Sequence, residues 1–291
     1  MDLVALVALV LLPFVAGIMV GWGLRALVSL NRRERSGGGK KAKNFIESEP
    51  AISDRTKMPD APEQSYRLLR RFIPKFMQPY LRGLRKRLQR GNRLGEPYRT
   101  VFPYTQVHPI RQQNLVRIGR DIDTRRVPGA VVECGVLDGG TAALMGFATK
   151  QRSIHLFDSW EGLPGISEKD GEAGMWAGDV VGSPRRATAI FKALGVNLDR
   201  VIFHKGWFNE TFQKAWIPEI ALLHVDADFY DSVRLALETW EPFVSPGGYI
   251  QIDDYSSFIG CRRAVDEYLA GRPDLILQTF GDIAYYIQKP F

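Results

Sequence analysis

The C-terminal two thirds of the chain alternate between short apolar runs and stretches with helical spacing. The apolar runs are rich in Val, Ile, Leu and Phe, and they are AVVECGV, SIHLFDSW, VIFHKG, IALLHVDADF and GGYIQIDDY. Such runs predict buried strands. Helical patterns lie between several of them, as in TAALMGFATK, SPRRATAIFKALG and SVRLALETWEPFV. The alternation predicts an α/β fold over residues 96–291, a doubly wound and mostly parallel sheet with helices on both faces.

The C-terminal end of this region has a different pattern. FIGCRRAVDEYLAG predicts one more helix, because Cys261, Val265, Tyr268 and Leu269 share a face. Two apolar runs follow, LILQTFG and IAYYIQKP, and only a short GD stretch separates them. So tight a connection predicts an antiparallel hairpin at the edge of the sheet.

The N-terminal pattern is that of a membrane segment. Leu3 to Leu24 contain no charged residue, and 22 residues as a helix cross a hydrocarbon core of about 30 Å. A cleaved signal peptide is the alternative, but it requires positive charge before the apolar run. Here the charges follow, from Arg25 onward. The pattern therefore favours a retained single-pass transmembrane anchor within residues 1–30, with the catalytic domain on the cytoplasmic side.

Two further segments separate this anchor from the α/β region. Residues 31–65 are rich in Gly, Ser, Pro and charge, which predicts a flexible basic linker. Residues 66–95 carry apolar side chains at helical spacing with Arg and Lys between them, and Pro74 and Pro79 divide them into shorter helices. This basic amphipathic segment could lie on anionic lipid headgroups. It could equally pack on the catalytic domain with a solvated basic face.

Charge is distributed unevenly along the chain. Met1 to Thr100 hold 20 Lys and Arg against 8 Asp and Glu, whereas the remainder holds 19 against 24. An anionic partner is therefore expected for the first third only, and the absence of a nucleic-acid-binding motif argues against nucleic acid. The two cysteines, Cys134 and Cys261, fall in an expected strand and an expected helix, which predicts buried thiols without a disulfide or metal role.

The candidate chemistry lies where the expected strands end, and ligands of open α/β sheets bind at that edge. The first strand ends in ECGVLDGGTA, where Gly135, Gly139 and Gly140 allow the backbone to approach a ligand closely. Glu133 precedes this turn and suits an ammonium group. Asp158 ends the second strand, about twenty residues further on, where a carboxylate can accept ribose hydroxyls. Together they indicate an adenosine ligand with an amino-acid end.

Carboxylates also follow the fourth and fifth strands. Asp226 and Asp228 end HVDAD, and Asp253 and Asp254 end QIDD. Buried carboxylates repel one another, so a compensating charge is expected near them. Trp207, after the third strand, is placed where an adenine could stack, although a core or lid role explains it as well.

Several of these motifs together resemble the macrocin O-methyltransferase family, whose members methylate sugar hydroxyls with S-adenosylmethionine and a metal. The resemblance rests on VPGAVVECGVLDGGTAALM, LFDSWEGLPG, FHKGWFNETF, LLHVDADFYDSVRLALE, SPGGYIQIDDYSSFIGCRRAVDEY and YTQVHP. It covers roughly Tyr104 to Ile287 and implies a class I methyltransferase fold. Leu137-Asp138 departs from the family pattern, where an aromatic and a basic residue often precede the glycine pair.

The resemblance also implies roles for individual residues. Asp226, Asp253 and Asp254 match the family's ligands for Mg²⁺ or another divalent cation, which would compensate the clustered acids. Asp226 is carried over as general base too, with His224 as the alternative, and Asp228 is expected to hold the loop. The residues expected to bind S-adenosylmethionine are Glu133, Gly135, Gly139, Gly140, Asp158, Ser159 and Trp207. The acceptor is expected to be a hydroxyl of a small molecule or glycan.

Two other functions remain open from the residues alone. HVDADF contains the Asp-x-Asp of many glycosyltransferases, but that reading leaves the glycine turn and Asp253-Asp254 unexplained. The second alternative function is a membrane-tethered adaptor that has lost catalysis.

The polar stretch between Gly165 and Pro184 is long enough to form a lid over substrate. The sequence leaves a homo-oligomer open.

Overall fold

The computed structural model describes residues 73–88, 94–171 and 177–291, all within one compact unit, Pro59–Phe291. The expected anchor at 1–30, the linker at 31–65 and part of the basic segment lie outside the described residues. None of the helices in the described ranges combines the length and hydropathy that a membrane crossing demands.

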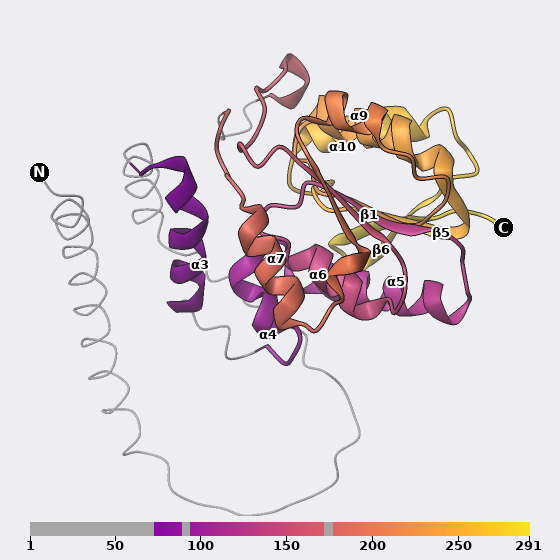
Figure 1. Cartoon of the computed structure of the whole chain (residues 1–291). Coiled ribbons are helices and arrows are strands. Elements are labelled where there is room, and N and C mark those ends of the chain that lie inside the picture. Colours follow the sequence, from indigo (N-terminus) through magenta and orange to yellow (C-terminus); the bar gives the residue numbers. More distant parts are fainter. Residues whose placement is uncertain (1–72, 89–93, 172–176) are drawn as a thin grey trace, which may run out of the picture. The chain divides into compact units, whose positions relative to one another are not determined.

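A seven-stranded sheet forms the centre of the fold (Figure 1). Its strands are β1 Ala130–Cys134, β2 Ile154–Asp158, β3 Val201–Lys205, β4 Ile220–Val225, β5 Val244–Ile252, β6 Leu277–Phe280 and β7 Ala284–Gln288. Their order across the sheet is β3-β2-β1-β4-β5-β7-β6. The first five are parallel, while β7 runs antiparallel to both β5 and β6. The expected parallel sheet and C-terminal hairpin are confirmed.

Helices cover both faces of this sheet. The α-helices are α3 Gln78–Leu88, α4 Tyr98–Val101, α5 Pro109–Thr124, α6 Gly140–Ala148, α7 Pro184–Ala193, α8 Phe208–Thr211, α9 Tyr230–Trp240 and α10 Ile259–Leu269. Short 3-10 helices are η1 Lys75–Met77, η3 Phe102–Tyr104, η4 Glu168–Asp170, η5 Leu198–Arg200, η6 Phe212–Lys214 and η7 Glu241–Phe243. In Figure 1, α9 and α10 lie over one face of the sheet, and α5, α6 and α7 lie under the other.

Alternating side chains of the strands feed two separate cores. In β1, Val132 and Cys134 pack into the core beneath α9 and α10, whereas Val131 packs into the core with α5 and α6. This period-two alternation is why a strand buried on both faces consists almost wholly of apolar residues. Cys134 and Cys261 are both buried and free, as expected from their positions.

Helix α5 begins at a proline and was not expected from the apolar pattern. Pro109 stands in its first turn, where no backbone donor is required, and the His108 side chain accepts from the Ile110 amide at 3.2 Å. Polar residues of α5 face inward, among them Arg111, Gln112 and Asn114. In α3, Pro79 likewise lies in the first turn, so it begins that helix and does not interrupt it.

Candidate active site

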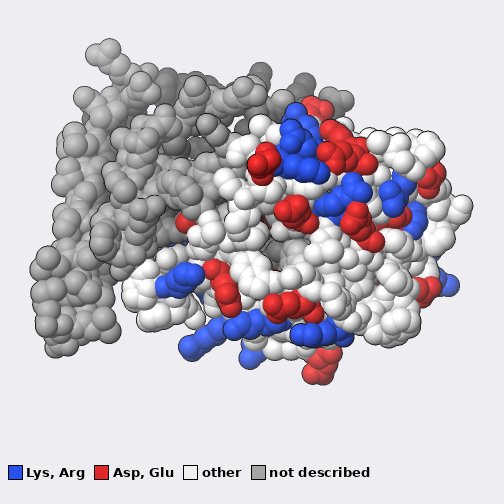
Figure 2. Space-filling model, turned by 90° about the horizontal axis from the view of Figure 1, so that it is seen from above, with Lys and Arg blue, Asp and Glu red and all other residues white. Residues whose placement is uncertain are grey.

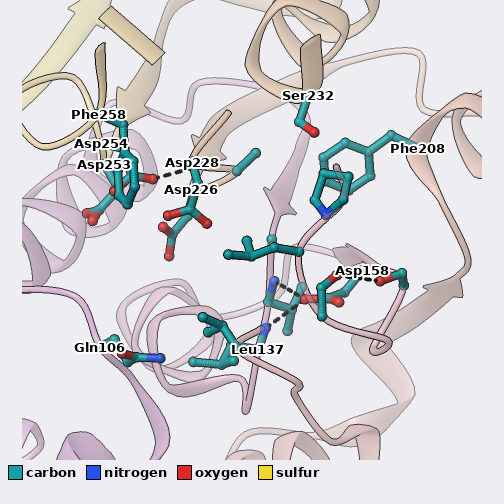
Figure 3. Close-up of a pocket in the computed structure, with 18 of the residues that line it drawn as sticks. Gln106, Leu137, Asp158, Phe208, Asp226, Asp228, Ser232, Asp253, Asp254 and Phe258 are labelled. Atoms are coloured by element: carbon teal, nitrogen blue, oxygen red, sulfur yellow. Dashed lines mark hydrogen bonds between the residues drawn. The ribbon is translucent and has the colours of Figure 1, made fainter. Parts of the chain in front are cut away.

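A cavity of about 670 Å³ opens at the carboxyl ends of the parallel strands. Turns that follow β1, β2, β3, β4 and β5 all contribute to its lining. Figure 3 shows the acidic cluster at one end of this cavity and Asp158 at the other. The volume is in the range of ligand pockets, about 300–1,000 Å³.

Two glycines of the turn that follows β1 lie very close to neighbouring segments. Gly135 has φ +90° and lies directly against the backbone carbonyl of Asp226, so that a Cβ could not be placed there. Gly139 has φ +78°, and a Cβ on it would come within 2.7 Å of the Ala187 Cβ. Only glycine combines this backbone conformation with such proximity. The turn therefore brings β1 and β4 into contact at the cavity.

Asp158 holds the glycine turn from the end of β2. Its Oδ2 accepts from the amides of Val136 and Leu137, each at 2.8 Å, and its Oδ1 accepts from the Trp160 amide at 2.6 Å. Burial raises the pKa of this carboxyl, while the three amide bonds oppose that rise. Trp160 completes the arrangement by donating its indole N–H to the Leu137 carbonyl at 2.9 Å. Asp158 is thus a positioning group for the turn as well as a lining residue.

The residues expected to bind the cofactor divide into two groups. Gly135, Asp158, Ser159 and Trp207 line the cavity. The others lie behind the lining in the described structure, and they are Glu133, Gly139 and Gly140. Glu133 is fully buried, and its Oε1 is 2.8 Å from His224 Nδ1. Its contact with a ligand ammonium therefore stays a prediction.

The acidic cluster joins the ends of β4 and β5, as the sequence predicts. Asp226, Asp253 and Asp254 each place a carboxylate oxygen within 4.8 Å of the other two. Burial, together with the mutual repulsion of these acids, raises the pKa values of Asp226 and Asp254 well above the ordinary range. Carboxylates this close require a positive charge beside them to stay ionised.

Two protein cations supply part of that charge. Arg111 Nη1 contacts Asp253 Oδ2 at 2.8 Å, and its other nitrogens donate to the hydroxyls of Ser256 and Ser257 and to the Ile283 carbonyl. His224 is fully buried; burial alone would lower its pKa, but the Asp253 and Glu133 carboxylates outweigh this and raise it to about 9.

The two cations leave the cluster short of positive charge. They face five carboxyl groups, which are Glu133, Asp226, Asp228, Asp253 and Asp254. Asp253 Oδ1 is buried without a hydrogen-bond partner in the described structure, and His224 Nε2 stands 3.8 Å from it, beyond hydrogen-bond range. Three converging carboxylates with an unpaired oxygen form a hard donor set, which fits Mg²⁺ or a similar cation.

Asp228 differs from its neighbours in orientation. Its backbone has φ +56°, uncommon for a residue with a side chain, and its amide donates to Asp254 Oδ2 at 3.2 Å. Asp228 lines the cavity next to Asp226 (Figure 3). Burial, and then the charges of Asp253 and Asp158, raise its pKa to about 7.

Between these two ends the cavity wall is mixed in character. Phe208, Leu235 and Phe258 present apolar surface, and Ser232 adds a hydroxyl (Figure 3). The stretch expected to form a lid contributes Val180, while Gly162 and Leu163 come from the turn before it. Asp170 fixes part of that stretch by accepting from the Tyr230 amide at 2.7 Å.

Sequence reasoning missed two charged contacts of this site. Arg111 lies 142 residues from Asp253, and nothing in its local pattern distinguishes it from a surface arginine. Asp138, noted only as a departure from the family pattern, is fully buried between Arg82 of α3, at 2.7 Å, and Arg186 of α7, at 3.2 Å. For the second contact, the only available signal in the sequence was an acidic residue directly before the glycine pair.

The described surface seen in Figure 2 carries Lys and Arg interleaved with Asp and Glu. A nucleic-acid-binding face would instead show a continuous basic field.

Comparisons with known proteins agree with this geometry. The sequence model of the family described as Macrocin-O-methyltransferase (TylF) matches residues 54–275. Demethyldecarbamoylnovobiocin O-methyltransferase of Streptomyces niveus is 32% identical over 183 residues, which cover 57% of this chain and 68% of that protein.

A second relative and a solved structure extend the comparison. The 8-demethyl-8-(2,3-dimethoxy-alpha-L-rhamnosyl)-tetracenomycin-C 4'-O-methyltransferase of Streptomyces olivaceus is 32% identical over 186 residues, 60% of this chain and 70% of that protein. The structure of the O-methyltransferase NovP superposes with a TM-score of 0.56 at 31% identity, covering 65% of this chain and 83% of that one.

Proposed function

Because the chain belongs to the macrocin O-methyltransferase family, and is thereby an S-adenosylmethionine-dependent O-methyltransferase, we propose that it methylates a hydroxyl of a sugar or glycosylated acceptor with the aid of a divalent cation. This family membership sets aside the glycosyltransferase interpretation of Asp-x-Asp. The observation that carries the rest is the convergence of Asp226, Asp253 and Asp254 at one end of a cavity whose other end is the glycine turn.

The methyl donor and the cation would have different roles in the proposed reaction. When bound, S-adenosylmethionine supplies the methyl group, and a cation at the three aspartates lowers the pKa of the hydroxyl to be methylated. The chain's own contribution is to bind, orient and deprotonate.

At the glycine end, the residues that line the cavity are proposed to hold the methyl donor. Gly135 leaves room for close backbone approach. Within the described residues, Asp158 Oδ1 accepts only from the Trp160 amide and therefore keeps one lone pair with which to accept a hydroxyl. Trp207 offers an aromatic face to an adenine. The rigid bonding of Asp158 to the turn keeps this end in one shape without ligand.

At the acidic end, we propose that Asp226, Asp253 and Asp254 hold the cation, with Arg111 fixing Asp253. The family resemblance also implies that Asp226 is the general base. A carboxylate that coordinates a cation is a weaker base, because the positive charge stabilises its ionised form. Asp228 lines the cavity beside the cluster without being one of the three converging ligands. We therefore propose that the Asp228 carboxylate accepts the hydroxyl proton, with Asp226 kept as ligand.

The acceptor class is supported by the cavity wall and by a relative. Apolar faces from Phe208 and Phe258 next to hydroxyl and carboxylate groups suit a sugar ring, which has one apolar and one polar aspect. The Streptomyces olivaceus relative is named for a rhamnosyl substrate. Membrane attachment through Leu3–Leu24, with the catalytic domain on the cytoplasmic side, is also part of the proposal and rests on the apolar pattern alone.

The test uses the purified full chain with methyl-labelled S-adenosylmethionine and rhamnosyl glycosides as acceptors. We expect label on the sugar in Mg²⁺, its loss in EDTA, and its return when Mg²⁺ is restored. Isothermal titration with S-adenosylhomocysteine should show binding. Transfer that proceeds equally in EDTA would remove the cation from the proposal, and absence of transfer to any sugar hydroxyl would remove the acceptor class.

A separate comparison tests the base. Asp228→Asn is expected to lower turnover while the concentration of Mg²⁺ needed for half-maximal activity stays unchanged. Asp226→Asn should alter both. If Asp228→Asn leaves turnover intact, the proton goes elsewhere.

A further inference from the structure

Helix α3 presents its apolar side away from the domain. Phe76, in the preceding turn, and Tyr80 and Leu84, in the helix, follow one another at intervals of four, and their exposed fractions are 73%, 43% and 52%. Residues four apart share one face of a helix. This exposed stripe, Phe76, Tyr80 and Leu84, is opposite to what a helix packed on a core through its apolar face would show.

The polar side of α3 is the side that faces the domain. Arg82 reaches the fully buried Asp138 at 2.7 Å, and Lys86 donates to the Thr105 carbonyl. Burial lowers the pKa of Lys86 to about 8, consistent with an ammonium turned inward. Gly83 allows this approach, since a Cβ there would collide with the Arg186 guanidinium. The orientation of the helix is therefore set by charged contacts at the glycine turn, and the exposed stripe follows from them.

We propose that the exposed stripe of α3 docks on an anionic lipid surface. Lys75 is exposed near one end of the stripe. Arg87 is exposed near the other end, where one of its N–H groups donates to the Tyr104 hydroxyl and the remaining donors are left for a headgroup. Both lie in a region of the chain, Met1 to Thr100, with 20 basic and 8 acidic residues. Apolar side chains with flanking cations are the pattern of helices that lie in the headgroup region of anionic membranes.

The position of α3 in the chain supports lipid as the occupant. The apolar stretch Leu3–Leu24 is long enough to cross a bilayer, and 48 residues, 25–72, separate it from the described chain. The expected flexible linker, residues 31–65, would span roughly 30 Å as a random coil, so a membrane holding the first segment would be within reach of α3. Three apolar side chains bind weakly alone, but tethering raises their effective concentration at the surface. This surface is independent of the reaction proposed above.

The experiment labels α3 in the full chain. Cys134 and Cys261 are buried, so Leu84→Cys introduces one accessible thiol for an environment-sensitive fluorophore. Trp216→Cys is the matched control, since Trp216 is 82% exposed and lies outside α3. Both proteins are reconstituted in phosphatidylcholine vesicles with and without phosphatidylglycerol, each containing a headgroup-region spin-label quencher.

Quenching at position 84 should exceed that at position 216, and phosphatidylglycerol should raise it by about two-fold or more. Phe76→Ser, in the Leu84→Cys chain, should lower the excess and leave the unfolding temperature unchanged, because the Phe76 side chain is 73% exposed; Tyr80 is left in place because its ring contacts the Arg186 guanidinium. Equal quenching at positions 84 and 216 overturns the proposal. So does a photo-cross-link from a benzophenone maleimide at position 84 to this chain or to a second copy, which would show that protein covers the stripe.

Discussion

The two ends of the cavity handle buried carboxylates in opposite ways. At the glycine end, Asp158 accepts from three backbone amides, and its charge is stabilised by the fold itself. At the acidic end, Asp226, Asp253 and Asp254 converge on one another, with Arg111 and His224 as partial compensation. One end is complete within the protein, whereas at the other the described cations compensate the clustered carboxylates only in part, which is the basis for the proposed cation.

This difference predicts which substitutions should lower the stability of the fold and which should lower activity instead. A change at the glycine end disturbs contacts that the folded chain needs in any state. A change at the acidic end removes repulsion between like charges, which the proposed function explains as the requirement of a bound cation. The two ends should therefore respond differently to conservative substitution.

The largest effect is expected from neutralising the acidic end. Asp226→Asn and Asp254→Asn should each lower turnover by about 10³-fold, because a cation contributes several kcal/mol to catalysis and 1.36 kcal/mol is a factor of ten. In EDTA, each variant should be more stable than the parent by on the order of 1 kcal/mol, since a buried charge beside like charges is gone.

Turnover with labelled donor and urea unfolding in EDTA measure the two quantities. Asp274→Asn, on the exposed surface, is the control and should change neither. If the acidic variants lose stability in EDTA, the cluster is a structural network and the contrast between the two ends fails.

The second-largest effect is expected from a substitution in the glycine turn. Gly135→Ala requires φ +90° of a residue with a Cβ, and places that Cβ on the Asp226 carbonyl. We expect a loss of about 3 kcal/mol or more in the free energy of unfolding. Urea unfolding measures it, and Gly271→Ala, with open space around it, is the matched control. An alanine tolerated as well at 135 as at 271 would mean that the turn is not rigid.

A smaller effect should come from the residue that orients Asp253. Arg111→Lys keeps the charge but loses the forked contacts to Asp253, Ser256 and Ser257. Apparent Mg²⁺ affinity should fall by about 10–100-fold, with turnover largely recovered at saturating Mg²⁺. Activity titrated with Mg²⁺ checks this, with Arg120→Lys, exposed on the same helix, as control. Unchanged half-saturation would exclude a positioning role for Arg111.

The smallest effect is expected at a histidine pair away from both ends of the cavity. This pair should contribute to the loss of stability in acid separately from the carboxylates. His155 and His204 lie outside the cavity lining with Nδ1 and Nε2 3.0 Å apart. Burial, and then the His204 charge, lower the pKa of His155 from 6.5 to about 4. Between these values the unfolded chain binds the proton and the folded one does not, so stability is full above pH 6.5 and falls toward pH 4.

For a half-buried ring this amounts to roughly 1–2 kcal/mol. His155→Gln should therefore flatten the loss of unfolding free energy between pH 6.5 and pH 4.5, measured in urea. A pH profile identical to that of the parent would assign the acid sensitivity to other groups.

The sequence predicted the sheet because its signal is local. All five parallel strands and the hairpin come from apolar runs; β1, β4 and β5 are almost wholly buried, whereas β3 and β6 at the two edges of the sheet are only partly buried. The ends of β4 and β5 brought Asp226, Asp253 and Asp254 together as expected. Parallel strands share an edge, so residues that follow them become neighbours whatever their separation in sequence.

What the sequence did not predict depends on contacts between distant polar residues. Helix α5 turns Arg111, Gln112 and Asn114 inward, which breaks the apolar periodicity that reveals a helix. The Arg82–Asp138 pair joins residues 56 positions apart, and the sequence around neither residue predicts which residue it will contact. The amides that donate to Asp158 are backbone groups, so no residue type in the sequence predicts them.

The close contact of Gly135 with the Asp226 carbonyl has a consequence for how such enzymes diversify. It joins the donor side and the acid side along one backbone seam, with no side chain between them that could vary. The wall proposed to receive the acceptor, with Phe208, Ser232 and Phe258, belongs to α8, α9 and the turn before α10, outside that seam. On the proposed function, mutations there would exchange one acceptor for another while the reacting centre keeps its dimensions, so new substrates would be accessible without rebuilding the chemistry.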